Sequence, residues 1–211
     1  MGTLKESRKG VMVQLEGADE AELTNDIVTV SLLQIALRAD AHRLQTLLNE
    51  WGETAETATP EGRFSLLQQV AQGLSDYSRY WTHVLASSKT VNAYEEAEEL
   101  FNAWSLRERS KFSETLTNVD GVITRRSPVP LSVDDTPAYI VVTLILGTEG
   151  DLPLFDEIYS ASALRGVLDD IRLMQPRYLV VFEMLWSPQD LDDSLTEAEL
   201  ATEYAEMAAI A

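Results

Sequence analysis

The sequence predicts an α+β fold, with a sheet of about four strands and amphipathic helices packed on it. Some stretches are rich in β-branched and aliphatic residues that alternate with polar ones or run unbroken, which is the strand pattern. Other stretches repeat apolar residues at intervals of three and four, which places those residues on one side of a helix. A segment rich in proline and serine separates two such sets, so we expect two strand–helix halves joined by a linker.

Composition divides the chain into four parts that we expect to form one compact domain overall. The beginning is charged and rich in turn-forming residues, and the proline- and serine-rich segment has the composition of a linker. The expected parts are an N-terminal arm at 1–26, a first αβ half at 27–120, a linker at 121–137 and a second αβ half at 138–211.

Strand signals occur in both halves and in the arm. Residues 27–37 are aliphatic and β-branched, and residues 80–87 are aromatic and β-rich. Residues 139–146 are almost entirely apolar, as in a strand that is central in a sheet, and residues 178–186 give a second strong signal. The short alternating run 11–15 predicts a strand added at a sheet edge.

Helix signals follow the strands. After residue 40, apolar residues recur at helical intervals, the stripe being Leu44, Leu47, Leu48, Trp51 and Ala55. Thr59 before Pro60 predicts a helix start, because threonine caps free N–H groups and proline gives up only a donor that has no partner there. Ser105 followed by Glu108 has the spacing of a capping box inside the helical pattern that begins after residue 92, so we expect a bend there.

The second half repeats this organisation. A helical stripe around Leu168 ends before Pro176, which cannot continue a helix. Thr196 and Glu199 form a capping box, which predicts the start of a last helix.

Charge and composition exclude several classes of protein. The chain has 16 Lys+Arg against 35 Asp+Glu, a formal net charge of −19, so we do not expect nucleic acid as a partner. Its apolar runs are much shorter than the roughly 18 residues that a membrane span requires. The absence of cysteine excludes disulfides, thiolate metal sites and cysteine nucleophiles.

The sequence contains no GxGxxG, P-loop, GxSxG or HExxH motif, so we expect no catalytic residue, no metal site, no cofactor and no enzyme activity. Two polar residues, His83 and Glu183, lie in expected strands, and their environments need to be explained. His83 alternates with Trp81 and Leu85, so the three should share one face, and we expect a partly buried, hydrogen-bonded histidine. Glu183 lies in an apolar strand, where it either faces solvent, which we favour, or is buried with a partner.

Four stretches of the sequence resemble a known family. They are SKFSETLTN at 110–118, YIVVTL at 139–144, EMLWSPQ at 183–189 and LTEAEL at 195–200. In them the chain resembles domain-of-unknown-function family 1517 of cyanobacteria and chloroplasts, whose plant members include the fluctuating-light acclimation protein. The resemblance covers about residues 28–204, and Ser187 is a mild departure, since members usually read WTPQ there.

The resemblance implies association with photosynthetic membranes and a role in acclimation to changing light. The expected location is therefore the cytoplasm or stroma, with the thylakoid surface as one option. It implies no enzyme activity, cofactor or catalytic residue. Members typically carry an apolar membrane segment and a glycine-rich stretch ahead of the matching region. This sequence has neither, so a soluble relative and a truncated chain are both open.

Three hypotheses for function follow. The first is a non-enzymatic regulatory or scaffolding domain that binds a protein partner, for example in a photosynthetic membrane complex, through Trp186, Pro188 and Gln189. The alternative for these residues is structural, with Trp186 filling the core and Pro188 ending a strand. The second hypothesis is a small-ligand binder or enzyme with a pocket between helices and sheet, using the residues His83, Tyr139 and Glu183. The third is a homo-oligomer formed through a sheet edge such as 11–15.

Overall fold

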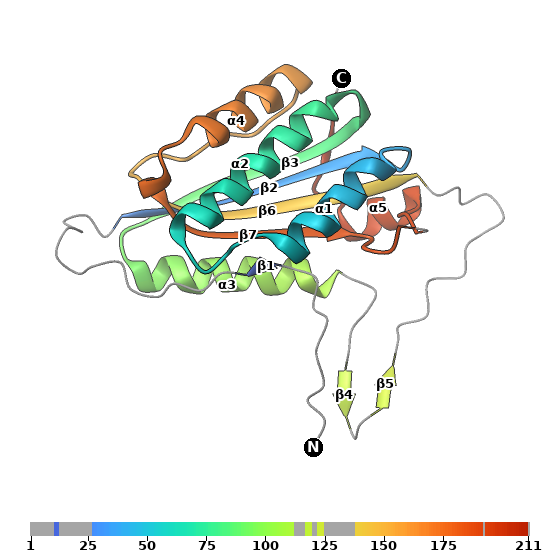
Figure 1. Cartoon of the computed structure of the whole chain (residues 1–211), viewed down its shortest axis with the longest axis horizontal. Coiled ribbons are helices and arrows are strands. Elements are labelled where there is room, and N and C mark those ends of the chain that lie inside the picture. The colour runs from blue at the N-terminus through green and yellow to red at the C-terminus, as the bar shows by residue number, and fades with distance from the viewer. Residues whose placement is uncertain are drawn as a thin grey trace.

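One six-stranded antiparallel sheet forms the centre of the computed structural model (Figure 1). The structure describes residues 27–111, 138–191 and 193–210, together with the backbone of the short strands at 11–12, 117–119 and 122–124. The long strands are β2 (Val28–Arg38), β3 (Trp81–Val91), β6 (Tyr139–Glu149) and β7 (Leu179–Ser187). The short strands β1 (Val11–Met12) and β8 (Ala208–Ala209) complete the order β1-β7-β6-β2-β3-β8. A separate two-stranded sheet contains β4 (Thr117–Val119) and β5 (Val122–Thr124).

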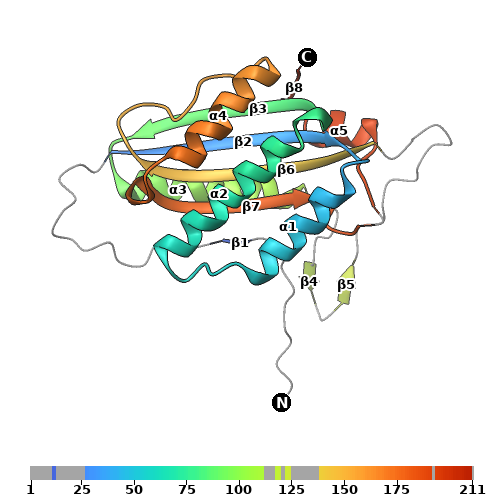
Figure 2. The same cartoon turned by 45° about the horizontal axis from the view of Figure 1, so that its top comes forward.

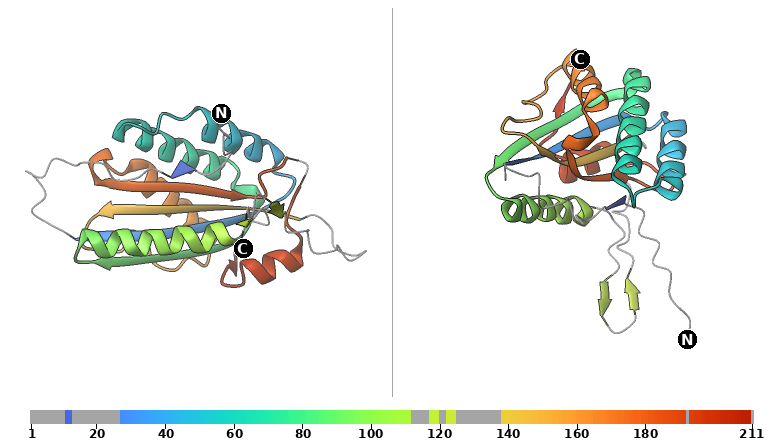
Figure 3. Two further views of the ribbon diagram at one scale, coloured as in Figure 1. Left: turned by 90° about the horizontal axis from the view of Figure 1, so that it is seen from below. Right: turned by 60° about the vertical axis from the view of Figure 1, so that its left-hand side comes forward.

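Helices cover both faces of the large sheet (Figures 2 and 3). The helices are α1 (His42–Thr54), α2 (Pro60–Asp76), α3 (Tyr94–Ser110), α4 (Ala161–Leu173) and α5 (Glu197–Glu203), with short 3-10 turns η1 (Ser78–Tyr80) and η2 (Pro176–Tyr178). The main core lies between the sheet and α1, α2 and α4. Smaller apolar clusters hold α3 and α5 on the opposite face. We call this second side the α3 face.

The helix starts agree with the expected capping residues. Thr59 Oγ1 accepts a hydrogen bond from the backbone N–H of Gly62 at 3.1 Å, and Pro60 is the first residue of α2. Thr196 and Glu199 form a complete capping box at the start of α5. Both predicted starts are therefore confirmed.

The predicted bend in α3 is wrong. The helix runs unbroken from Tyr94 to Ser110, and Ser105 and Glu108 are both buried within it. The Glu108 carboxylate bonds to side chains from other positions, so it does not cap a backbone N–H group. The spacing of a capping box therefore arose here from two residues with other structural roles.

The predicted common face for Trp81, His83 and Leu85 is also wrong. Trp81 pairs with Leu37 whereas His83 pairs with Ala36, so β3 contains one extra residue at this point. The bulge turns Trp81 into the core beneath α2, where its Nε1 donates to the Leu74 carbonyl at 3.1 Å. His83 and Leu85 lie on the α3 face.

The α+β class is confirmed, but the sheet has six strands, and the division into two halves is not confirmed. Strands from before and after the expected linker join directly, because β2 lies between β3 and β6. The linker itself, 121–137, lies outside the described residues except for β5. In the arm, β1 pairs with β7 at the sheet edge, while 13–15 lie outside the described residues. The described ranges contain no helix with the length and hydropathy of a transmembrane segment.

Candidate functional site

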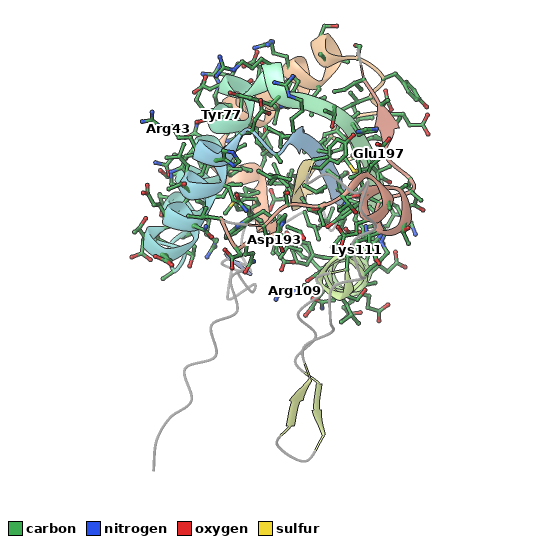
Figure 4. The ribbon with its side chains drawn as sticks, turned by 90° about the vertical axis from the view of Figure 1, so that its right-hand side faces the viewer. Arg43, Tyr77, Arg109, Lys111, Asp193 and Glu197 are labelled. Carbon is green, nitrogen blue, oxygen red and sulfur yellow. The ribbon has the colours of Figure 1, made fainter. Side chains whose placement is uncertain are left out.

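The residues that the sequence singled out lie mainly at one end of the sheet. This is the end where β2 and β7 finish and where β3 and β6 begin. Figure 4 looks onto it, with Arg43 and Tyr77 on the side of α1 and α2, and with Arg109 and Lys111 on the side of α3. Asp193 lies between these two sides. This end of the sheet is therefore the candidate site.

The turn after β7 carries the expected partner-binding residues. Trp186 is only 1% exposed and belongs to the main core, so it supports the turn from below. Pro188, which follows a cis peptide bond, and Gln189 are half-buried at the turn, and Asp190 is exposed. A partner at this corner would contact the turn itself, because the indole of Trp186 lies in the interior.

Two side chains of α1 hold this turn in place. Gln45 Nε2 donates to the carbonyls of Pro188 at 2.9 Å and Asp190 at 2.7 Å. Asn49 Nδ2 donates to the Gln189 carbonyl at 3.3 Å. Gln45 and Asn49 are four residues apart and share one side of the helix. Sequence reasoning missed both, since helical spacing does not identify the loop that their amides meet.

The three residues of the ligand-binding hypothesis do not converge. His83 and Tyr139 form an edge-to-face ring pair with centroids 5.8 Å apart, and His83 Nδ1 lies 3.0 Å from Thr82 Oγ1. Glu183 lies on β7, with β6 and β2 between it and β3, and it bonds to α3 instead. The structure thus brings His83 and Tyr139 together and keeps Glu183 apart from them.

Glu183 is completely buried, so the favoured solvent-facing prediction is wrong and the alternative is confirmed. Arg109 Nε donates to Glu183 Oε1 at 2.8 Å, and the Arg109 Nη2 group also contacts this oxygen. Arg109 Nε lies 3.3 Å from Ser105 Oγ as well. The side chain of Arg109 retains 27% exposure, so the ion pair joins the buried sheet surface to the molecular surface.

A second buried carboxylate belongs to Glu108, the residue that precedes Arg109 on α3. It is 1% exposed and accepts from Gln34 Nε2 at 2.5 Å, Lys111 Nζ at 2.7 Å and Arg107 Nε at 3.1 Å. Gln34 Nε2 also donates to Thr143 Oγ1 at 3.0 Å. Burial of a carboxylate is tolerated when it is paired and hydrogen-bonded in this way. Glu108 therefore connects α3 to β2 and, through Gln34, to β6.

The network extends to α5 through Tyr204. The ammonium of Lys111 lies 4.5 Å from the centroid of the Tyr204 ring, within the range of a cation–π contact. Burial raises the pKa of the Tyr204 hydroxyl well above its usual value, and the Glu108 carboxylate adds to the rise. A hydrogen bond with Ser187 opposes it. Tyr204 therefore stays neutral at physiological pH.

The arrangement has the character of a structural network. The two buried carboxylates, Glu108 and Glu183, are bonded to cations, and Glu108 also accepts from the amide of Gln34. Among residues 27–111, 138–191 and 193–210, no group of three or more His, Asp or Glu side chains is arranged to hold a metal ion. On the surface of this end, the turn at Pro188 and Gln189 is anchored by hydrogen bonds from α1.

These observations define a domain with helices on both faces of an antiparallel sheet and with buried ion pairs under α3. The chain belongs to the family of proteins of unknown function DUF1517, whose model matches residues 27–210. The resemblance read from the sequence is thereby confirmed.

Two named proteins are similar to most of the chain. Protein FLAP1 homolog A of Synechocystis sp. is 30% identical over 200 residues, which cover 90% of this chain and 60% of that protein. The chloroplastic FLUCTUATING-LIGHT-ACCLIMATION protein 1 of Arabidopsis thaliana is 30% identical over 188 residues, which cover 88% of this chain and 48% of that protein. The chain thus spans about half to three-fifths of the length of these relatives. No solved structure matches.

Proposed function

We propose that this chain is a non-enzymatic regulatory or scaffolding domain that acts in acclimation to changing light through contacts with other proteins. One observation carries the proposal, namely that two proteins named for fluctuating-light acclimation match nine-tenths of the chain. A partner in a photosynthetic membrane complex fits such a role. The corresponding location is the cytoplasm or stroma, including the thylakoid surface.

The chemistry of the described residues supports a binding role over a catalytic one. Glu108 and Glu183 are engaged by cations, and His83 packs on Tyr139, so these groups serve packing and anchoring. General acid–base catalysis instead needs titratable groups that converge on one reacting atom. Pro188 and Gln189 offer a contact surface whose backbone carbonyls are held by α1.

Domain replacement tests the biological role. The matching region of the Synechocystis relative would be exchanged for this chain in a strain that lacks that protein. We expect growth and chlorophyll fluorescence under fluctuating light to be restored, with little difference between strains in constant light. Reinsertion of the relative's own region is the positive control. A stable exchanged protein that restores nothing while this control succeeds would overturn the proposed role.

A second experiment tests the corner formed by Pro188 and Gln189. Cross-linking of the wild-type chain in a cyanobacterial lysate would identify a partner, whose affinity is then measured with purified proteins. We expect Gln189→Ala to weaken this affinity and Gln175→Ala, an exposed glutamine before η2, to leave it unchanged. Equal affinities for both variants would remove the corner from the proposal.

A further inference from the structure

A group of arginines surrounds the aromatic residues of η1 on the β3 side of the same end. The guanidinium carbons of Arg38 and Arg79 lie 5.2 and 4.7 Å from the centroid of the Tyr80 ring. Tyr77 stacks against Tyr80 with centroids 5.8 Å apart. Arg165 of α4 lies 5.7 Å from the Trp81 ring. We call Arg38, Arg79, Arg165, Tyr77 and Tyr80 the arginine–aromatic patch.

The arginines of the patch are held in position although they are exposed. Arg79 Nη2 donates to the Tyr80 hydroxyl at 2.7 Å, and Arg165 Nη2 donates to Ser78 Oγ at 2.7 Å. A guanidinium that rests on an aromatic ring keeps N–H groups free to bond to a ligand. Side chains that are already ordered lose less conformational entropy on binding.

The positive charge of the patch is only partly neutralised. Arg38 pairs with the exposed Asp40, which lowers the pKa of that carboxyl group. Arg79 and Arg165 form no ion pair with any residue in the part of the chain that the structure describes. Asp76, at the end of α2, accepts a hydrogen bond from a neighbouring glutamine instead. Two arginines without an acidic partner in the described ranges are unusual in a chain with 35 acidic and 16 basic residues.

The start of α1 adds to the positive potential. Its N-cap residue makes no side-chain hydrogen bond, and its first turn contains no acidic residue. The exposed Arg43 lies in this turn, and Figure 4 shows it in the same corner as Tyr77. The positive end of the helix dipole and Arg43 therefore act in the same direction as the patch.

We propose that the arginine–aromatic patch is the docking site for a short acidic peptide segment of a partner protein. Arginines bind carboxylates through paired N–H groups, and charge complementarity favours an anionic partner. A membrane or a nucleic acid would bring extended negative charge against a body with a net charge of −19. A short segment meets mainly the local positive field, because charges more than about 8 Å away are screened at physiological salt.

This inference goes beyond the proposed function, because it adds a contact surface separate from the corner at Pro188 and Gln189. The corner follows β7, whereas the patch lies at the end of β2 and the start of β3, and β6 lies between β7 and β2. Failure of peptide binding would remove the patch and leave the light-acclimation role to the replacement experiment.

Fluorescence anisotropy with labelled peptides and the full chain tests the inference. We expect a peptide of alternating glutamate and serine to bind, with an affinity that falls as salt is added, and the matching glutamine–serine peptide not to bind. The double variant Arg79→Gln/Arg165→Gln should weaken binding by roughly tenfold or more, as expected for lost hydrogen bonds to charged groups. Circular dichroism would verify that this variant is folded.

A matched control is available at the opposite end of α2. Arg177 lies over Tyr178 at 5.0 Å, and Arg63, in the first turn of α2, donates to the Thr57 carbonyl in the loop before this helix. The double variant Arg63→Gln/Arg177→Gln makes the same change in net charge and should bind the acidic peptide as the wild type does. Equal weakening by both double variants, or no binding by the wild type, would overturn the proposal.

Two further measurements distinguish other anionic partners. Sedimentation with vesicles of phosphatidylglycerol tests a membrane, and analytical ultracentrifugation tests a second copy of this chain. We expect neither to depend on Arg79 and Arg165. Vesicle binding or self-association that is lost in Arg79→Gln/Arg165→Gln, and that is stronger than peptide binding, would assign the patch to that partner instead.

Discussion

Among single residues, Glu183 depends most clearly on one neighbour. Oε1 is bonded to Arg109, whereas Oε2 has no hydrogen-bond partner within the described ranges. Removing the arginine would therefore leave a buried carboxylate with no compensating charge. Such a loss is far more costly than losing an ion pair on the surface.

We expect Arg109→Met to lower the free energy of unfolding by about 3 kcal/mol. In Arg109→Met/Glu183→Leu both charges are gone, and stability should return to within about 1 kcal/mol of the wild type. Urea denaturation of the two single variants and the double variant measures this coupling. Arg172→Met removes a half-exposed pair with Asp169 and should cost less than about 0.5 kcal/mol. Additive effects of Arg109→Met and Glu183→Leu would contradict the role assigned to the pair.

The raised pKa of Tyr204 predicts that the fold loses stability at alkaline pH. Its pKa is raised in the folded state by burial, so the folded chain holds this proton more tightly than the unfolded chain does. The stabilisation is complete below the unfolded value of about 10 and is lost progressively as the pH rises above it. Urea denaturation across this range should show a shallower decline for Tyr204→Phe than for the wild type. Tyr178→Phe, at an exposed position, should retain the wild-type slope, and identical slopes for all three proteins would rule out this role of Tyr204.

Residue 52 needs to be glycine because the ring of Trp186 leaves no room for a side chain there. A Cβ atom at this position would lie 2.9 Å from the Trp186 ring, which is fixed in the core. Gly52→Ala should therefore destabilise the fold by about 1–3 kcal/mol, as overpacking does. Gly166 on α4 has no atom within 4 Å of the corresponding position, so Gly166→Ala should stabilise by roughly 0.5–1 kcal/mol. Thermal denaturation measures the direction of the stability change in each variant. If Gly52→Ala were stabilising, the ring of Trp186 would have to be able to move.

At the scale of elements, α5 depends on its capping box. It has seven residues, too few to be stable in isolation. Thr196 Oγ1 accepts from the Glu199 N–H at 3.2 Å, and Glu199 Oε2 accepts from the Thr196 N–H at 2.8 Å. Thr196→Ala should cost about 1 kcal/mol and speed amide hydrogen exchange throughout α5. Thr202→Ala, at an exposed position in the same helix, is the control, and equal protection in the two variants would argue against the cap.

The same elements show what local sequence can predict. The starts of α2 and α5 followed from Thr59 and Thr196, because a cap bonds to residues two or three positions away. Ser105 and Glu108 have capping spacing, yet their partners come from tertiary packing. The environment of Glu183 depends on Arg109, which is 74 residues away, and the bulge before His83 is set by pairing with β2. The spacing of apolar residues along the chain reveals neither contacts between distant side chains nor the pairing of strands.

For the candidate site, sequence reasoning found the turn at Trp186 but not its supports on α1. It did not single out Arg38, Arg79 or Arg165, because these arginines are far apart in sequence. Their grouping requires the order of the strands and the packing of α4 beside α2. Charge counts alone indicated an acidic molecule and concealed its local positive region.

For the whole molecule, the strand order has a consequence for how the chain could be divided. β2 pairs with β6 along its full length, and α2 packs on α4, so residues 27–111 and 138–210 each supply one side of a shared interior. Either piece alone would expose a long unpaired strand edge and half of an apolar core. We expect the separate pieces to be poorly folded and prone to aggregate, and to regain native circular dichroism when they are produced together. Such self-assembling fragments would make this domain a reporter in which reassembly signals that two attached proteins have met.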